Sequence, residues 1–286
     1  MSIRNPIEWS LEQLRLTNTA VSTASSAVYG HHEADRAAPA VIRQISAADL
    51  KDALAKGVED FGVFRTDVIF LCMIYPMIGL LLGRLAFGSG LMPMVFPLAS
   101  GFALVGPVAA FGVMEMSRRR ELDHAVGWPD AVSVVRSPAF GAIVGLGLVL
   151  VALYTLWLIA ASMIYSATLG PEAPASLSAF MNDVFTTRRG WTMIGVGMGV
   201  GFLFAVLALA ISVVSFPMML DREVSLEKAI GTSVRAVAAN PMTMALWGLI
   251  VAAGLVLGSI PLFLGLIVVL PILGHATWHL YRKVIM

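Results

Sequence analysis

The stretch AFGAIVGLGLVLVALYTLWLIAASMIYSAT, residues 139–168, decides the fold class, because it runs for 30 residues without a charged side chain. A helix rises about 1.5 Å per residue, so about 20 apolar residues cross a hydrocarbon core of about 30 Å. Of the 286 residues, 58% are hydrophobic and 13% are charged, against about 45–50% and about 25% in soluble domains. The sequence therefore predicts an all-α, polytopic membrane helix bundle.

Six segments are long and apolar enough to cross a membrane, so we expect about six transmembrane helices. They cover residues 68–87, 91–114, 139–168, 191–219, 242–260 and 261–281. Short links join the first two and the last two, which predicts two antiparallel hairpins. The chain then divides into a cytoplasmic arm over 1–40, partly helical or disordered, an amphipathic cytoplasmic helix over 41–66 and a transmembrane domain over 67–286.

Lysine and arginine residues indicate the orientation, because positively charged loops resist translocation. The basic residues on one side of the spans are Arg65, Arg118, Arg119, Arg120, Arg136, Arg222, Lys228, Arg235, Arg282 and Lys283. The other side has only Arg188 and Arg189, in the segment 169–190. We therefore expect a multi-pass protein of the bacterial inner (cytoplasmic) membrane, with both termini in the cytoplasm and this segment outside.

The segment before the first span is expected to form the amphipathic helix. Leu50, Leu54, Val58 and Phe61 recur at helical spacing and fall on one face. At the start of this helix, the hydroxyl of Ser46 is expected to accept a hydrogen bond from the backbone amide of Asp49. Two placements stay open, along the inner membrane surface or docked against the bundle, and the balanced charge favours docking.

The two halves of the chain show a similar pattern of residues. The markers are Met114, Arg118, Gly127 and Pro138 in the first half, and Met218, Arg222, Gly231 and Pro241 in the second. Each half would contain three spans and a loop helix, beginning near Trp128 or Ser225 and ending before a proline that starts the next span. A 3+3 internal repeat explains the pattern, and chance alignment of apolar segments is the alternative.

Five polar residues in or beside the spans are the candidate site residues. His275 and His279 project from one face of the last helix; anchoring at the inner interface is favoured over a ligand pair, because no cysteine or carboxylate lies nearby in sequence. Arg84 either reaches the outer interface or faces a polar cavity. Asp67 and Glu115 lie at inner ends of spans, where surface ion pairs are favoured over an ion entrance.

These residues do not match known catalytic or cofactor-binding patterns. A catalytic haem–copper subunit needs several histidines on different helices, and the spans contain no paired aspartates, serine–histidine arrangement or HExxH-like motif. The glycine-rich run over 195–201 has neither the strand nor the lysine of a phosphate loop, and instead permits close helix packing. We therefore expect no cofactor, no metal and no enzyme activity, and at a net charge of +1 no nucleic-acid binding.

Three stretches resemble a known family: FRTDVIFLCMIYP from Phe64, PLASGFALVGPVAAFGVMEMSRRRE from Pro97 and GLIVVLPILGHATWHLYRKV from Gly265. They look like the bacterial integral membrane proteins grouped as domain of unknown function 2189, and the resemblance covers about residues 41–285. It implies a membrane protein without an established function. Some members of the family carry a provisional cytochrome c oxidase label.

The leading functional hypothesis is a non-enzymatic accessory, assembly or regulatory partner of another membrane complex, such as a respiratory oxidase. The alternative is a small-molecule, lipid or ion transporter, favoured by the repeat, by Arg84 and by the prolines in the spans. The expected partners are the lipid bilayer and either another membrane protein or a second copy of the chain. A polar cavity near the bilayer midplane would favour transport, whereas a fully packed apolar bundle would count against it.

Overall fold

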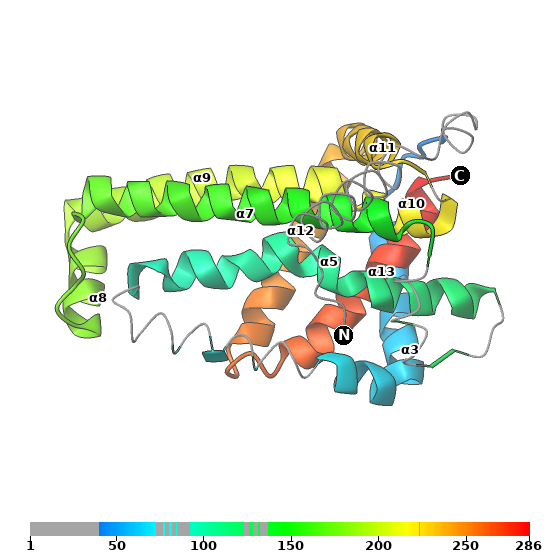
Figure 1. Cartoon of the computed structure of the whole chain (residues 1–286), viewed down its shortest axis with the longest axis horizontal. Helices are drawn as coiled ribbons and strands as arrows, with labels where there is room; N and C mark the ends of the chain where they lie inside the picture. The colour runs from blue at the N-terminus through cyan, green and yellow to red at the C-terminus, as the bar shows by residue number, and fades with distance from the viewer. Residues whose placement is uncertain are drawn as a thin grey trace, which may run out of the picture.

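The chain forms a helical bundle in a computed structural model, which describes residues 40–72, 77, 80–81, 84, 92–122, 126–127, 131, 137–222 and 224–286 (Figure 1). The helices are α3 (Ala47–Cys72), α5 (Val95–Glu121), α7 (Phe140–Thr168), α8 (Leu177–Thr186), α9 (Arg188–Ser212), α10 (Ser215–Arg222), α11 (Leu226–Ala239), α12 (Pro241–Ser259) and α13 (Leu266–Val284), with a 3-10 turn, η1 (Met92–Met94), before α5. This described part has no β-strand, only an isolated antiparallel bridge between Ile42 and Ile285. The predicted all-α class is confirmed.

Three helices in these ranges are long and apolar enough to cross a membrane: α7, the unit of α9 and α10 from Arg188 to Arg222, and α12. They match the spans predicted at 139–168, 191–219 and 242–260. Only 6% of the most apolar stretch of the α9–α10 unit and 39% of that of α7 are buried inside the protein. Apolar surfaces of this extent are stabilised by lipid and not by water.

The first two predicted spans are described less completely. The segment 91–114 lies mainly within α5, which continues beyond it to Glu121. Most of 68–87 lies outside the described residues. The helix predicted over 41–66 does not end there, because α3 continues to Cys72. The total of six spans and the 3+3 repeat therefore stay predictions.

The last predicted span, 261–281, begins later than expected. Residues 260–265 form turns, in which Leu262 and Phe263 have positive φ angles of 51° and 65°. The helix α13 begins only at Leu266. The link between α12 and α13 is thus longer than the short turn that the sequence predicted.

The helices α7 and α9 run along the long axis of the bundle, whereas α3 runs across them, and the two ends of the bundle differ (Figure 1). The helices α7 and α9 lie side by side, with α5 running along them (Figure 1). The helix α8 crosses one end of this pair, whereas α10, α11 and the C-terminus gather at the other (Figure 1). We call these the α8 end and the C-terminal end. Near the C-terminal end, α3 and α13 form the most extensive helix pair of the described part.

The loop helix predicted in the second half is present as α11. The Ser225 hydroxyl accepts a hydrogen bond from the Lys228 backbone amide at 3.3 Å and so caps the N-terminus of the helix. Asn240 follows the helix, and Pro241 lies in the first turn of α12, where its missing N–H costs no hydrogen bond. The predicted counterpart near Trp128 lies largely outside the described residues.

The helix α3 docks against the bundle, which is the placement that the sequence favoured. It packs antiparallel to α13, and a salt bridge at 2.8 Å joins Asp52, near the start of α3, to Lys283, near the end of α13. From Ala47 to Phe64, where side chains are described, its buried positions are Leu50, Ala53, Gly57, Asp60 and Phe64. The predicted face was wrong in part, because Val58 is exposed. Small residues, and not only large apolar ones, line the closest contact between the two helices.

The N-terminus of α3 also differs from the prediction. The Asp49 amide donates to the backbone carbonyl of Ser46 at 3.1 Å and not to its hydroxyl. Instead, the amide and the hydroxyl of Ser46 both donate to the Asp49 carboxylate, each at 2.9 Å. These hydrogen bonds hold the pKa of Asp49 below its ordinary value of 3.8.

Gly57 sets the distance between α3 and α13. A Cβ atom added to Gly57 would lie 2.7 Å from the Cβ atom of Ala276 and 2.8 Å from the Ile272 carbonyl oxygen. We predict that Gly57→Ala lowers the Tm of the protein in detergent, although alanine is favoured over glycine inside a helix by about 1 kcal/mol. The matched control is Gly62→Ala, where an added Cβ meets no atom within 4 Å. This control should keep or raise the Tm, and equal changes in the two variants would contradict the close contact.

Candidate functional site

Polar side chains from three helices meet inside the bundle. The helix α3 supplies Asp60, α5 supplies Ser117 and Arg120, and α13 supplies His275 and His279. We call these five residues the polar network. Asp60, Ser117 and His275 are only 3%, 1% and 0% exposed. Groups buried to this degree are tolerated because they bond to one another.

Local sequence brings these side chains onto facing surfaces. The two histidines are one helical turn apart on α13, and Ser117 and Arg120 are three residues apart on α5, so each pair shares a helix face. Gly274 permits close approach of α13 to α5, since an added Cβ would lie 3.2 Å from the Cβ of Ala110. Gly57 does the same for α3 and α13. The small residues therefore bring the three helices close enough for direct hydrogen bonds.

The Asp60 carboxylate is the centre of the polar network. Its Oδ2 atom accepts hydrogen bonds from Ser117 Oγ at 2.6 Å and from His279 Nε2 at 2.8 Å. Its Oδ1 atom accepts from Arg120 Nη1, while Arg120 Nη2 donates to Glu59 Oε1 at 2.7 Å nearer the surface. One carboxylate thus joins α3 to both α5 and α13.

These contacts keep Asp60 ionised in spite of its burial. Burial by itself would raise the pKa of the carboxyl, but hydrogen bonds from His279 and Ser117 outweigh it. The pKa falls from 3.8 to about 2. Because the folded value lies below the ordinary one, the ionised carboxylate stabilises the fold above about pH 4, and this contribution is lost as the pH falls toward 2.

Ser117 connects His275 to Asp60. Its hydroxyl has one proton, which it donates to the carboxylate, so its oxygen is left to accept from His275 Nδ1 at 2.6 Å. This assignment places a proton on Nδ1 of His275. Among the residues that the structure describes, the Nε2 atom has no hydrogen-bond partner. The ring stacks on Phe64 with 5.9 Å between the ring centroids.

The arrangement of Ser117, His275 and Asp60 differs from that of a catalytic triad. In a triad the histidine bonds to the serine through one ring nitrogen and to the carboxylate through the other. Here the serine bonds directly to the carboxylate, and Asp60 Oδ2 lies 3.8 Å from the same Nδ1 atom that faces the serine. In the described ranges, no three His, Cys, Asp or Glu side chains are placed to hold a metal ion. The geometry is that of a link between helices.

The structure corrects the interpretation of the two histidines. His275 is fully buried, so the prediction that it anchors the helix at the membrane interface was wrong. No carboxylate lies near the two histidines in sequence, but the fold brings Asp60 to them from a distant part of the chain. Sequence reasoning missed Asp60, Ser117 and Arg120.

The other three candidates have different surroundings. Glu115 is buried and not at the surface as expected; Arg118 donates to it at 2.7 and 2.9 Å, and Arg119 at 2.7 Å. Arg84 is helical with an exposed side chain, so its two interpretations stay open. The side chain of Asp67 lies outside the described residues.

An apolar cavity lies on another side of α13. Its volume is about 500 Å³, and it lies between α5, α9, α12 and α13. Gly274 lines this cavity, whereas the next residue, His275, belongs to the polar network. The hydroxyls of Ser212 and Thr277 also line it, but each donates at 2.6 Å to a carbonyl of its own helix. The cavity therefore suits a hydrocarbon ligand better than a polar one.

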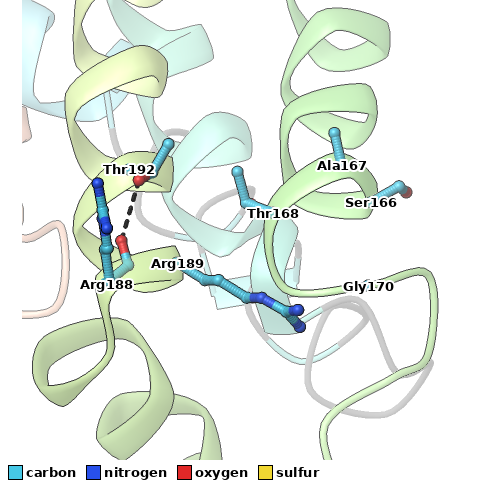
Figure 2. A pocket seen from close by; sticks show the side chains of 7 residues that line it. All are labelled: Ser166, Ala167, Thr168, Gly170, Arg188, Arg189 and Thr192. Carbon is cyan, nitrogen blue, oxygen red and sulfur yellow. Dashed lines mark hydrogen bonds between the residues drawn. The ribbon is translucent and has the colours of Figure 1, made fainter.

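A separate open depression of about 580 Å³ lies at the α8 end, where α7 ends and α9 begins. Figure 2 shows the residues that line it: Ser166, Ala167, Thr168, Gly170, Arg188, Arg189 and Thr192. Both arginine side chains are exposed, and the Thr192 hydroxyl donates to the Arg188 carbonyl at 2.9 Å. This basic surface lies at the opposite end of the bundle from α10 and α11 (Figure 1).

The apolar helices and the buried polar network define an all-α integral membrane protein. Residues 95–221, from α5 to α10, match the model of a family described as "Predicted integral membrane protein (DUF2189)". The predicted relationship to this family is confirmed for that segment, which is less than half of the chain. No curated protein and no solved structure matches.

The contribution of Asp60 to stability can be measured by comparison with its exposed neighbour, Glu59. Asp60→Ala would leave the buried Ser117 hydroxyl and the His279 ring without their acceptor, which costs about 1–3 kcal/mol. We predict a clear fall in Tm in detergent for this variant. Glu59→Ala removes the exposed acceptor of the same arginine, a contact worth about 0–1 kcal/mol, and should change the Tm little. A fall for Asp60→Ala no larger than that for Glu59→Ala would contradict the central role of this carboxylate.

Proposed function

We propose that this protein is a non-enzymatic membrane protein that holds the apolar chain of a lipid-like molecule in the cavity between α5, α9, α12 and α13. The observation that carries the proposal is the size and lining of the cavity. Its volume of about 500 Å³ lies within the range of about 300–1,000 Å³ found for small-molecule sites. Its lining hydroxyls are already bonded to backbone carbonyls.

Among the small-molecule, lipid and ion alternatives, the apolar lining of the cavity favours a lipid. A polar solute or an ion would lose its hydration in this cavity and gain few hydrogen bonds in return, which is unfavourable. A hydrocarbon chain loses no such contacts. The packing of the polar network agrees with a non-enzymatic role, because its serine is buried and bonded to the carboxylate.

The position of α13 supports the same proposal. One side of this helix forms a wall of the cavity, and another side is fixed to α3 and α5 by the polar network. A wall held in this way keeps the cavity open without needing a ligand. The network would therefore preorganise the site, and preorganisation lowers the cost of binding.

The membrane and the orientation are part of the proposal. The basic residues favour the bacterial inner membrane with both termini in the cytoplasm. The gathering of α10, α11 and the C-terminus at one end, with α8 at the other, supports a multi-pass arrangement in which 169–190 is outside (Figure 1).

Filling the cavity tests the proposal. At Gly106, which lines it, an added Cβ meets no atom within 4 Å, so Gly106→Leu fills space without a clash at Cβ. The protein in detergent is exposed to a photoactivatable fatty acid, and covalent labelling is measured by mass spectrometry. We predict labelled peptides from α5, α9, α12 or α13 and a several-fold loss of labelling in Gly106→Leu. The control is Gly197→Leu, outside the cavity and also free of contacts, which should label normally. Equal labelling of both variants would reject the proposal.

A second candidate is the accessory, assembly or regulatory partner of another membrane complex, such as a respiratory oxidase. Glycines four residues apart permit close helix packing. At Gly195 and Gly199 of α9, however, an added Cβ meets no atom of the described residues within 4 Å. At Gly201, in contrast, an added Cβ would lie 3.0 Å from the Trp157 ring of α7. The vacant glycines favour a helix of another membrane protein or of a second copy.

Partner binding is tested by co-purification in mild detergent. We predict that a membrane protein, or a second copy carrying a different tag, is enriched with the natural chain and lost with the double variant Gly195→Leu, Gly199→Leu. A size change at an exposed position of α7, Leu148→Phe, serves as the control and should retain the partner. If the natural chain enriches no membrane protein over a mock purification, this second function is excluded.

A further inference from the structure

We infer that α8 is an interfacial helix, which inserts an uncovered apolar face into the phospholipid leaflet at the α8 end of the bundle. This site is distinct from the cavity, and it concerns the lipid surface as a binding partner. The argument depends on the pattern of α8, on what the chain covers and on where the helix lies.

The helix α8 has one continuous apolar face. Its large apolar residues are Leu177, Phe180, Met181, Val184 and Phe185. Their spacing gathers them on one side, while Ser178, Asn182, Asp183 and Thr186 lie away from it. This is the pattern of an amphipathic helix.

The chain covers only part of this face. Val184 is buried, and Phe180 packs edge-on against Tyr165 of α7 with 6.4 Å between the ring centroids. Leu177, Met181 and Phe185 are 48%, 46% and 51% exposed. Three large apolar side chains on a helix of 10 residues thus lack a cover from the described part of the chain.

The position of α8 indicates that the phospholipid leaflet covers these three exposed apolar side chains. It joins α7 to α9, two helices that are apolar and long enough to cross a membrane. It therefore lies where both leave the hydrocarbon. Figure 1 shows α8 across the ends of α7 and α9 and nearly perpendicular to them, which is parallel to the membrane surface. An apolar face in that plane meets the acyl chains just below the headgroups.

The residues next to α8 are typical of a membrane interface. Trp191 is exposed, and its Nε1 donates to the Phe185 carbonyl at 3.0 Å; amphipathic indoles favour this level of the bilayer. Arg188 and Arg189 are exposed at the start of α9, and Figure 2 shows Arg189 reaching from α9 toward the end of α7. Their positive charge complements lipid phosphates. Charge and apolar face together favour a phospholipid surface over a soluble protein.

The depth of α8 can be measured in the full chain. In a Cys72→Ser background, a single cysteine is introduced as Met181→Cys on the apolar face or as Asn182→Cys on the polar face, and each is labelled with the environment-sensitive NBD fluorophore. The proteins are reconstituted in vesicles of phosphatidylcholine and phosphatidylglycerol. Quenching by lipids spin-labelled near the headgroup is compared with quenching by aqueous iodide.

We expect the label at position 181 to be blue-shifted and quenched by the spin-labelled lipid about two-fold or more compared with the label at 182, which iodide should quench instead. Equal quenching at both positions would overturn the inference. A blue-shifted label at 181 that neither quencher reaches would also overturn it, since protein would then cover the face. Arg188→Gln with Arg189→Gln should reduce lipid quenching at 181 more with phosphatidylglycerol than without it, and an equal effect would overturn the role of the arginines.

Discussion

The buried carboxylate of Asp60 is the constraint on which the packing of α3, α5 and α13 depends. An ionised group inside a bundle is unfavourable unless all its partners are in place. Here Ser117 and Arg120 approach from α5 and His279 from α13. A shift of α3 by one turn would separate Asp60 from all of them and also move Gly57 out of its contact. The polar network therefore fixes the register of three helices at once.

Helix packing in a membrane protein depends on close contacts and interhelical hydrogen bonds more than on apolar burial. Lipid tails are as apolar as leucine side chains, so apolar burial gives little net drive for helices to associate in a bilayer. Close packing at Gly57 and Gly274 and the hydrogen bonds of Asp60 supply what burial does not. This explains how α13 can be held firmly on one side while its other side borders a cavity.

Sequence predicted the features that depend on local pattern and missed those that depend on tertiary contact. The apolar spans and α11, with Ser225 at its start and Pro241 after its end, are encoded over neighbouring residues. Asp60 was missed because the search for an apolar face selected large side chains such as Val58. The buried face instead continues through Ala53 and Gly57, and Asp60 follows at the same helical spacing. Small residues at that spacing are the signal that would have identified it.

Ser117 and Arg120 were missed for a different reason. They belong to the run that ends α5, where the arginines were interpreted only as a signal of orientation. Positive charge does indicate topology, but the same side chain can also pair with a buried carboxylate. No pattern within α5 distinguishes Arg120, which pairs with Asp60, from Arg118 and Arg119, which pair with Glu115. Only the packing of α3, which brings Asp60 to Arg120, distinguishes this arginine from the other two.

The two ends of the bundle differ in the kind of side chain that needs a partner. Near the C-terminal end, partners from three helices cover the buried Asp60 carboxylate. At the α8 end, the chain leaves apolar groups uncovered. A helix of 10 residues is too short to be stable in water by propensity alone, since isolated helices below about 12–15 residues are marginal. Part of the apolar face of α8 packs on Tyr165 and its neighbours, and the rest requires another apolar phase. The bilayer therefore belongs to the folded state at this end.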